Sequence, residues 1–335
     1  MSYAGLPVLV TGADGFIGSH LVEILVQRGA AVTALSCYNS FDKYGWLDDL
    51  PDTIRRDVRM IRGDVRDAAQ VRALVRGQTI IFHLAALISI PHSYVAAQSY
   101  VDTNVSGTLN VLDAAREFGA QRIVLTSTSE VYGTAITQPI AEDHPLQGQS
   151  PYAASKIGAD MMAEAFAKSF DLPAVILRPF NTFGPRQSER AIIPTIIRQA
   201  LDARCSTIRV GDTTTKRDLT FVQDTAEAFA AIGVAPSIEF GTAYNAGSGK
   251  SASIGELIKL IASLADADKP IVRDSCRMRP PNSEVRILLS DSSRLWEATG
   301  WKPKVPLREG LMQTIEWWSK RLTDGQVRRE HHFMS

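Results

Sequence analysis

The chain has 335 residues, and its 36 Lys and Arg residues balance its 36 Asp and Glu residues, so its formal net charge is zero. This length is sufficient for two domains with a substantial core. The balanced charge argues against a general polyanion binder, because nonspecific nucleic-acid affinity comes from an excess of basic residues. The longest apolar stretch, 79–91, is too short to span a bilayer, and the N-terminus lacks the basic region of a signal peptide. Cys37, Cys205 and Cys276 are few and widely spaced, which favours reduced thiols in the cytoplasm over disulfides or a metal site.

The first half of the chain alternates short β-branched runs with amphipathic stretches, a pattern typical of parallel βαβ units. It predicts strands at 8–10, 31–35, 58–61, 79–84, 122–126 and 174–177, and helices at 16–28, 67–76, 94–118 and 151–170. Ser150 as N-cap and Pro151 in the first turn mark the start of the last helix. After residue 180 the pattern loosens, although a strand at 243–246 and a capped helix at 253–265 are evident.

We therefore predict an α/β fold, with a Rossmann-type doubly wound parallel sheet in residues 1–180. Residues 181–335 are expected to form mostly a smaller C-terminal domain that completes a substrate cleft. The strand at 243–246 is a candidate to return to the main sheet. His83 is expected to be a buried core residue, and Trp317 and Trp318 to serve packing. His331 and His332 are expected to belong to a tail rather than to a metal site.

A glycine-rich turn follows the first strand and opens the first helix. Gly12, Gly15 and Gly18 form the pattern G-x-x-G-x-x-G. Such a turn permits positive φ and a close backbone approach to a pyrophosphate, whose charge the helix N-terminus favours. Its place after the first strand predicts dinucleotide binding. The second strand ends at Ser36, where an Asp or Glu usually binds the adenosine ribose. No arginine stands beside Ser36 for a 2′-phosphate, so NAD and NADP both stay open.

Tyr152 and Lys156 are four residues apart on a predicted helix, which places them on one face. An ammonium near a phenol lowers the pKa of the phenol, and a phenolate can remove a hydroxyl proton while hydride leaves the same carbon. The fifth strand ends in TSTSEVYG (126–133), at the carboxyl edge of the sheet where ligands bind. Thr128 is placed to hydrogen-bond the reacting hydroxyl, and Glu130 adds a carboxylate. Each signal alone is weak, but their combination predicts a catalytic site.

Nine motifs occur in a fixed order along residues 7–318. They are TGADGFIGSH, RGDVRD, FHLAA, TNVSGTLNVL, TSTSEVYG, YAASK, RPFNTFGPR, RD-x-x-x-V-x-D and YNAGSG. Together they resemble the extended short-chain dehydrogenase/reductases, the NAD-dependent epimerases and dehydratases that act on nucleotide sugars. The resemblance implies a Rossmann domain, a small substrate-binding domain, and a homodimer through a four-helix bundle of the helices near 94–118 and 151–170. It also implies NAD(P) as cofactor, with NAD favoured, and a nucleotide-sugar substrate, with neither nucleic acid nor membrane as a partner.

The resemblance assigns roles to individual residues. The catalytic set is Thr128, Ser129, Glu130, Tyr152 and Lys156. The cofactor-binding set is Gly12, Gly15, Phe16, Ile17, Gly18, Ser36, Asn39, Ser40, Asp64, Val65, Leu84, Ala85, Ala86, Asn104 and Thr126, together with Tyr152 and Lys156. The substrate-binding set is Ser89, His92, Asn181, Arg186, Pro194, Arg217 and Arg279, with Arg217 and Arg279 on the diphosphate. No metal is implied.

The segment Thr128-Ser129-Glu130 narrows the reaction within this family. A 4-epimerase removes a hydride, lets the 4-keto sugar rotate and returns the hydride, and it usually has no acid at the third position. A 4,6-dehydratase also needs a base for the C5 proton before water leaves C6, and Glu130 supplies one. Relatives acting on TDP-glucose carry Thr-Asp-Glu, whereas those acting on GDP-mannose carry Thr-Ser-Glu. Ser129 therefore leaves the acid for the C6 hydroxyl open.

Segments 38–48, 86–91 and 148–152 resemble the legionaminic-acid type of dehydratase, which acts on nucleotide-linked N-acetylglucosamine in bacterial surface-sugar synthesis. We therefore predict a 4,6-dehydratase that converts NDP-N-acetylglucosamine to a 4-keto-6-deoxy sugar. A UDP-glucuronate decarboxylase or a 4-epimerase is the alternative. The decarboxylase substrate calls for a cation, and the loop 87–94 offers only His92. A non-catalytic regulatory protein is a further alternative, but such relatives typically lose the tyrosine or lysine that this chain keeps.

Overall fold

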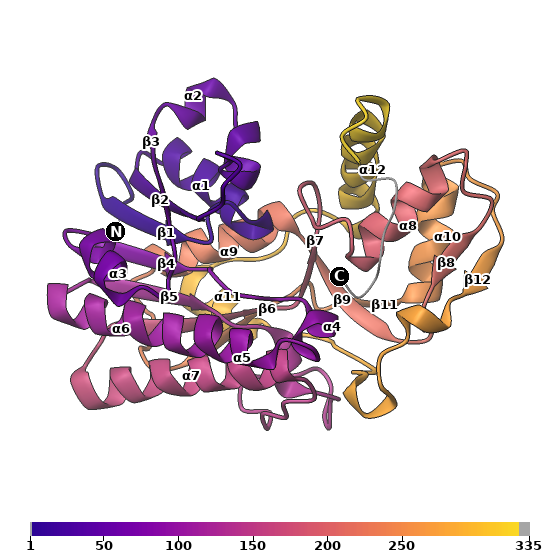
Figure 1. Ribbon diagram of the computed structural model, residues 1–335. Coiled ribbons are helices and arrows are strands. Elements are labelled where there is room, and N and C mark those ends of the chain that lie inside the picture. The colour runs from indigo at the N-terminus through magenta and orange to yellow at the C-terminus, as the bar shows by residue number, and fades with distance from the viewer. Residues whose placement is uncertain (1, 328–335) are drawn as a thin grey trace.

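The computed structural model describes residues 2–327, which form a larger and a smaller lobe (Figure 1). The larger lobe is built on a seven-stranded parallel sheet. From one edge to the other, its strands are β10 (Ala243–Ala246), β6 (Ala174–Pro179), β5 (Arg122–Thr126), β4 (Ile80–His83), β1 (Pro7–Thr11), β2 (Ala31–Cys37) and β3 (Val58–Gly63). The direction of winding reverses between β1 and β4, and ligands bind at the carboxyl ends of strands at such a point. The predicted Rossmann-type α/β fold is confirmed.

Helices cover both faces of this sheet because alternate side chains of each strand point to opposite faces. In β1, Val8 and Val10 belong to one hydrophobic cluster and Leu9 to the other. The helices on the first face are α1 (Phe16–Gln27), α9 (Val222–Val234) and α11 (Ser293–Thr299), and those on the second are α3 (Ala68–Val75), α6 (Gly107–Phe118) and α7 (Pro151–Phe170). Both faces are therefore shielded from water, as a parallel sheet requires.

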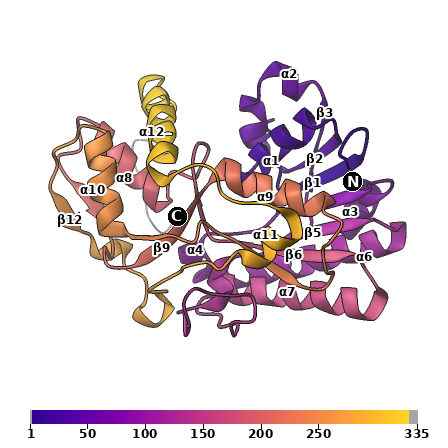
Figure 2. The same cartoon turned by 180° about the vertical axis from the view of Figure 1, so that it is seen from behind.

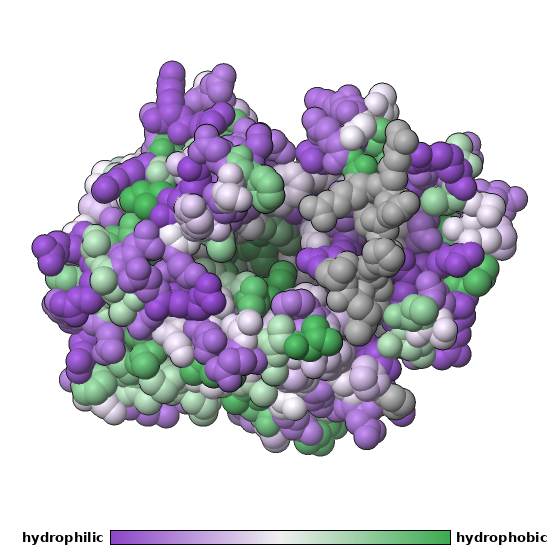
Figure 3. Space-filling model, in the orientation of Figure 1, coloured by the Kyte–Doolittle hydropathy of each residue, from purple (hydrophilic) through white to green (hydrophobic). Residues whose placement is uncertain are grey.

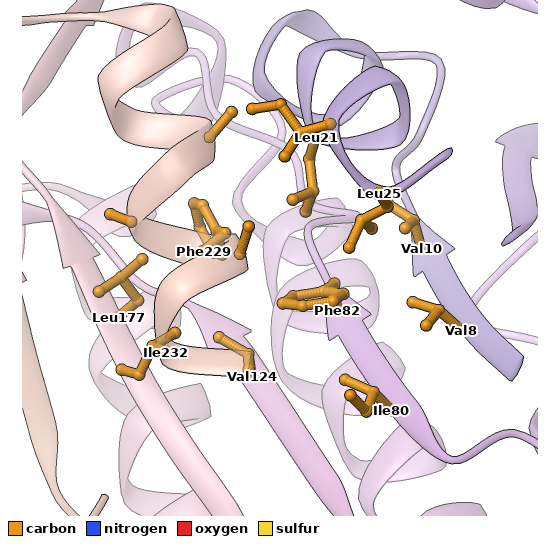
Figure 4. Close-up of a cluster of buried hydrophobic side chains, with 14 of the residues drawn as sticks. Val8, Val10, Leu21, Leu25, Ile80, Phe82, Val124, Leu177, Phe229 and Ile232 are labelled. Carbon is orange, nitrogen blue, oxygen red and sulfur yellow. The ribbon is translucent and has the colours of Figure 1, made fainter. Parts of the chain in front are cut away.

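Segments far apart in the sequence meet in the first cluster (Figure 4). Leu21 of α1 and Phe229 of α9 lie on the same side of the sheet as Phe82 of β4, and all three are fully buried. The strand β10 also comes from the C-terminal half, and it pairs in parallel with β6. Residues after 181 therefore help to build the larger lobe as well as the smaller one.

The smaller lobe contains two short sheets and three helices. Its strands are β7 (Asn181–Phe183), β9 (Lys216–Phe221) and β11 (Ser251–Ser253) in one sheet, and β8 (Ile208–Val210) and β12 (Ile271–Arg273) in the other. Its helices are α8 (Ile192–Leu201), α10 (Ile254–Leu264) and α12 (Leu307–Thr323), which enclose a separate core (Figure 2). Trp318 is buried in that core, which confirms the packing role expected for it.

Helix caps explain where several elements begin. Ser150 Oγ accepts from Ala153 N at 3.1 Å, as predicted for the start of α7. Ser253 and Glu256 form a reciprocal capping box at α10, also as predicted. Two short helices, Gly45–Asp49 (3-10) and α2 (Asp52–Arg55), lie between β2 and β3.

The predicted helix over 94–118 begins later than expected, at Ala97, and residues 101–106 are π-helical rather than α-helical. The chain instead forms α4 (Ile90–Ser93), α5 (Ala97–Tyr100) and a π-helical segment, Val101–Ser106, before α6 begins. Within the π-helical segment, the carbonyl of Asn104 accepts a hydrogen bond from the Thr108 hydroxyl at 2.6 Å. A side-chain bond of this kind competes with the helical ladder and loosens it. Apolar periodicity could not show this, because it records which face is buried and not how each turn is bonded.

Within residues 2–327, no helix combines the length and apolar character needed to cross a membrane. His331 and His332 lie outside the described residues.

Candidate active site

The glycine-rich turn packs closely against neighbouring backbone at the start of α1, where no side chain larger than glycine's would fit. Gly12 has φ +66°, and a Cβ there would lie 2.6 Å from Ala85 N. A Cβ on Gly18 would lie 2.2 Å from the Gly12 carbonyl oxygen. No side chain caps the N–H groups in the first turn of α1, which includes Phe16 and Ile17. The turn therefore fits a pyrophosphate, which those N–H groups and the helix dipole would bind.

The loop after β4 is held against this turn. Leu84 N donates to the Thr11 carbonyl at 3.1 Å, and Ala85 N donates to Thr11 Oγ1 at 3.2 Å. Thr11 Oγ1 is also hydrogen-bonded to His83 Nδ1 at 2.8 Å. Burial lowers the pKa of His83 to about 3, so the ring is neutral at physiological pH. His83 is a hydrogen-bonded core residue, as predicted.

Asn104 joins the same loop to the catalytic helix. Its Oδ1 accepts from Leu87 N at 2.8 Å, and its Nδ2 donates to the Leu87 carbonyl at 3.0 Å and to Ser155 Oγ at 2.9 Å. The side chain is almost completely buried. Asn104 therefore positions residues 84–87 against α7, on which Tyr152 and Lys156 lie.

Tyr152, Thr128 and Glu130 come together although they lie on separate elements. A short 3-10 helix, Ser129–Tyr132, follows β5, and a side-chain hydrogen bond joins Tyr152 to Thr128 just before it. Glu130 is close enough to raise the pKa of Tyr152 by electrostatic repulsion. Burial is the larger cause, and together these effects hold the pKa of Tyr152 above its usual value, whereas the bond to Thr128 lowers it.

Lys156 does not act on Tyr152 as we expected. Its Nζ donates to the carbonyl of Thr126 at the end of β5. Burial lowers the pKa of Lys156 to about 8, and the carboxylate of Asp160 opposes that effect. The expectation that Lys156 lowers the pKa of Tyr152 is not met here, because burial dominates and the ammonium is directed at the strand.

Arg279 from the smaller lobe reaches the carboxylate of Glu130, and Arg217 joins it through Glu284. Arg279 Nη1 lies 3.8 Å from Glu130 Oε2 and 3.9 Å from Glu284 Oε1. Arg217 Nη2 donates to Glu284 Oε1 at 3.0 Å, and Glu130 and Arg279 both act electrostatically on Arg217. Both predicted diphosphate-binding arginines are therefore assembled beside the predicted base. Glu284 completes this cluster, and sequence analysis did not identify it.

The loop from residue 87 to 94 and α8 contain further residues predicted to bind substrate. Ser89 is the N-cap of α4, and its carbonyl accepts from the Tyr100 hydroxyl at 2.5 Å. The ring of His92 lies 5.9 Å from that of Tyr100, whose ring is 6.3 Å from that of Tyr152. These contacts place Ser89 and His92 next to the catalytic tyrosine. Pro194 is buried in the first turn of α8, in the smaller lobe.

Arg186, which was predicted to bind substrate, contacts helix α1 instead. Its guanidinium forms a two-fold ion pair with Glu23 of α1, with N–O distances of 3.0 and 3.1 Å, and it also reaches Ser19. It therefore joins the segment after β7 to the helix that starts at the glycine turn. Its predicted role in substrate binding stays a prediction.

Residues predicted to bind the adenosine end of the cofactor surround the ends of β2 and β3. Asp64 is paired with Arg66, which lowers the pKa of Asp64, and Val65 packs tightly against Gly107. Asn39 uses its side-chain oxygen and nitrogen to close its own turn, bonding the backbone of Lys43 in both directions. Ser36 is fully buried, and Ser40 in the same loop is exposed.

Three predicted ligand-binding side chains each keep a buried polar atom with no hydrogen-bond partner in the part of the chain that the structure describes. They are Thr126 Oγ1, Asn181 Oδ1 and Arg279 Nη1. Buried polar groups are nearly always paired, so a bound ligand would supply the hydrogen bonds that these atoms lack, although Arg279 Nη1 already lies within ion-pair distance of Glu130 and Glu284. Figure 3 shows a hollow between the two lobes with apolar residues on its floor. These observations fit a cofactor and an anionic substrate.

Comparisons with known proteins agree with this arrangement. A family model described as GDP-mannose 4,6 dehydratase matches residues 9–314. Two relatives are 34% identical over 319 residues, covering 93% of this chain: a UDP-glucose 4-epimerase of Mycolicibacterium smegmatis (98% of its length) and a dTDP-glucose 4,6-dehydratase of Streptomyces griseus (94%). The chain belongs to the NAD-dependent epimerase/dehydratase family. This confirms the predicted extended short-chain dehydrogenase/reductase relationship, and the chain is an enzyme of the nucleotide-sugar 4,6-dehydratase and 4-epimerase group.

Solved structures of the epimerase/dehydratase family have the same fold. An epimerase of Methanothermobacter thermautotrophicus has a TM-score of 0.87 and 28% identity, over 97% of this chain and 95% of its own. The dTDP-glucose 4,6-dehydratase of Bacillus anthracis, solved in complex with NAD, has a TM-score of 0.81 and 26% identity, over 94% and 97%. Epimerases and dehydratases both match over nearly the whole chain at similar sequence identity, so the choice between the two reactions depends on the side chains of the site.

A buried polar network behind the site was missed by sequence analysis. Asp160 Oδ2 accepts from Ser127 Oγ at 2.8 Å and from Arg178 Nε at 3.1 Å. Arg178 Nη1 also donates to the Tyr132 hydroxyl at 2.9 Å. Asp160 stands one turn after Lys156, and this spacing was the only available signal of a link to the site. The network ties β5, β6 and α7 together next to Lys156.

Proposed function

We propose that this protein is a nucleotide-sugar 4,6-dehydratase that uses NAD(P) and acts on nucleotide-linked N-acetylglucosamine. The position of Glu130 is the observation that carries the proposal. Its carboxylate is mostly buried, adjoins Tyr152 and Thr128, and lies 3.8 Å from the guanidinium of Arg279. A 4-epimerase has no need of a base at this place, whereas removal of the C5 proton requires one.

The first step is oxidation of the sugar at C4. Bound NAD(P) would accept a hydride from C4, later return it to C6, and bring a positive ring that favours the phenolate of Tyr152. Tyr152 takes the proton of the C4 hydroxyl, and Thr128 hydrogen-bonds that oxygen. Lys156, which is cationic below about pH 8, provides positive charge beside the end of β5. Burial of Tyr152 and Lys156 strengthens their electrostatic interactions.

The second step is elimination of water across C5 and C6. The new C4 carbonyl makes the C5 proton acidic, and Glu130 removes it. The C5–H electron pair forms the C5–C6 double bond as the C6 hydroxyl leaves with a proton, which gives water. Glu130 or Ser129 supplies that proton. Hydride then returns to C6 and a proton to C5, so the product is a 4-keto-6-deoxy sugar and the cofactor ends as it began.

The smaller lobe is proposed to bind the nucleotide diphosphate of the substrate. Arg217 and Arg279 carry positive charge next to Glu130, and Asn181 has a buried carbonyl oxygen without a partner. We also propose that two copies of the chain form a homodimer. The interface would consist of α7, the π-helical segment and α6 from each copy. Met161 and Phe170 of α7 expose apolar side chains, as a bundle interface would require.

Mass spectrometry of the sugar product tests this proposal. The purified enzyme would be incubated separately with UDP- and GDP-N-acetylglucosamine, UDP-glucose and UDP-glucuronate. A loss equal to water with an N-acetylglucosamine nucleotide supports the dehydratase, and a loss equal to carbon dioxide identifies a decarboxylase instead. Glu130→Gln should abolish water loss and keep C4 oxidation, whereas Tyr152→Phe should abolish both. An unimpaired Gln variant would exclude Glu130 as the base.

Arg279 gives one specific reason to keep UDP-glucuronate decarboxylation as a second candidate. The sugar-facing loop contains no Lys or Arg, but the structure brings Arg279 to the same place from the other lobe. Its buried Nη1 makes no hydrogen bond among residues 2–327, although it lies within ion-pair distance of Glu130 and Glu284, and a substrate carboxylate would supply that bond. The UDP-glucuronate incubation distinguishes this reaction.

A further inference from the structure

The adenosine end of the dinucleotide site lacks the acidic residue that usually ends the second strand. That place in β2 is held by Ser36, which is fully buried, and by Cys37. The structure nevertheless brings a carboxylate there from another element. Asp14 lies inside the glycine-rich turn, and its Oδ2 accepts from Ser36 Oγ at 3.1 Å and from Cys37 N at 3.1 Å.

We propose that Asp14 replaces the missing β2 acid, binds the adenosine ribose, and makes this site selective for NAD over NADP. The inference rests on the proposed function only in that a nicotinamide dinucleotide must bind. An ionised carboxylate has about four lone-pair sites, and Ser36, Cys37 and its own backbone N–H occupy about three of them in Asp14. One acceptor position therefore remains for a ribose hydroxyl.

The turn is held in this position from a second side. Trp46 N donates to the Asp14 carbonyl at 3.1 Å, and a Cβ on Gly45 would lie 2.7 Å from the same oxygen. The short helix Gly45–Asp49 therefore packs directly on the turn. Asp14 is fixed before a ligand arrives, so binding requires no reorganisation of the carboxylate.

The nearby cations are occupied by other carboxylates. Arg66 forms a forked pair with Asp64 at the end of β3. Arg62, which is in register with Ser36, pairs with Asp42 at 2.6 Å and lies over the ring of Tyr44 at 4.1 Å. Across residues 2–327, no ion pair neutralises Asp14 within salt-bridge distance.

This charge pattern discriminates between the two cofactors. A ribose 2′-hydroxyl can donate to the carboxylate, whereas a 2′-phosphate would bring further negative charge against Asp14, and Arg62 or Arg66 would have to turn away from its own carboxylate to offset that charge. Like charges placed together at a binding site cost several kcal/mol. A free-energy penalty of this size corresponds to about a 100-fold difference in affinity. We therefore expect the native protein to bind NADH about 100-fold more tightly than NADPH.

Isothermal titration with NADH and with NADPH tests the assignment without an activity measurement. The proteins to compare are the native chain, Asp14→Asn and Asp57→Asn. Asp57 is an exposed carboxylate just before β3, so its variant matches the charge change away from the site. We expect Asp14→Asn to reduce the NADH preference at least tenfold, by weakening NADH and strengthening NADPH, and Asp57→Asn to leave it unchanged.

The ratio of the NADH affinity to the NADPH affinity shows whether Asp14 recognises the ribose or only supports the glycine-rich turn. If Asp14 only braced the turn, Asp14→Asn would weaken both nucleotides equally, and that result would overturn the inference. Equal binding of both nucleotides by the native protein would overturn it as well, while leaving the proposed dehydratase intact. Failure of the native protein to bind either nucleotide would reject the inference and the proposed function together. Thermal unfolding of each variant shows whether it is folded.

Discussion

Asp160 offers the sharpest test of how the catalytic helix is held in place. Its carboxylate is 2% exposed and lies between Arg178 and Lys156, both of which are also buried. The two N–O distances to Arg178 are 3.0 and 3.1 Å. Asp160→Asn keeps the shape of the side chain but removes the negative charge. It leaves two buried cations without their shared counter-charge, and we expect it to destabilise the protein strongly.

The size of the effect follows from the burial of the pair. Removing one partner of a buried ion pair costs about 3–5 kcal/mol, because the other charge stays desolvated. At roughly 2 °C per kcal/mol for a chain of this size, the midpoint of thermal unfolding should fall by roughly 6–10 °C. Adding Arg178→Met should restore part of this loss, because it removes one of the uncompensated charges.

Chemical denaturation followed by circular dichroism measures the change directly. Glu164→Gln is a matched control, since Glu164 lies one turn further along α7 and pairs at 3.5 Å with the exposed Lys168. That surface pair should contribute less than about 0.5 kcal/mol. A loss below about 1 kcal/mol in Asp160→Asn would refute the reasoning, because the buried cations would then not depend on this carboxylate.

Three further predictions follow from the same geometry. C4 oxidation, followed in a single turnover by cofactor absorbance, should decline as pH rises through about 8, because Lys156 loses its proton there; a flat profile would contradict its cationic role. The folded pKa of His83, about 3, lies below its unfolded value near 6.5, so stability present above about pH 6.5 is lost as pH falls towards 3. His83→Gln cannot titrate, and urea unfolding at about pH 5 and pH 7 should show a smaller acid loss than in the native protein; an identical loss would argue against His83. Asn104→Ala should cost about 1–3 kcal/mol and lower turnover, since it removes three hydrogen bonds to Leu87 and Ser155, and unchanged thermal unfolding would disprove that support.

Local patterns in the sequence were sufficient to predict the elements that carry the catalytic groups. Tyr152 and Lys156 share one helix because Ser150 caps it and Pro151 opens it, and those signals depend only on neighbouring residues. Every strand of the main sheet was predicted, including β10, although β10 has the sequence AYNA and contains no β-branched residue. The prediction of one regular α-helix over 94–118 was inaccurate for a different local reason. Its apolar pattern was helical, but hydrogen bonds around Asn104 widened the turns.

Contacts between segments that are distant in the sequence could be identified only from the tertiary structure. Parallel strands bring their carboxyl ends to one edge, which places Thr128 beside Tyr152, as the motifs suggested. No pattern in the sequence shows that Asp14 turns back to Ser36, or that Arg279 crosses from the smaller lobe to Glu130. The pKa of Tyr152 also depended on burial, which reversed the direction expected from spacing alone.

The sequence by itself therefore determined the fold class and the glycine turn and predicted the reacting groups, because periodicity, capping and motif order are properties of neighbouring residues. The tertiary structure decided the electrostatics. A chain with zero net charge gathers Arg217 and Arg279 at its proposed substrate site and leaves Asp14, among residues 2–327, without an ion pair at its proposed cofactor site. Only folding sets the distances and the burial on which the energy of those charges depends.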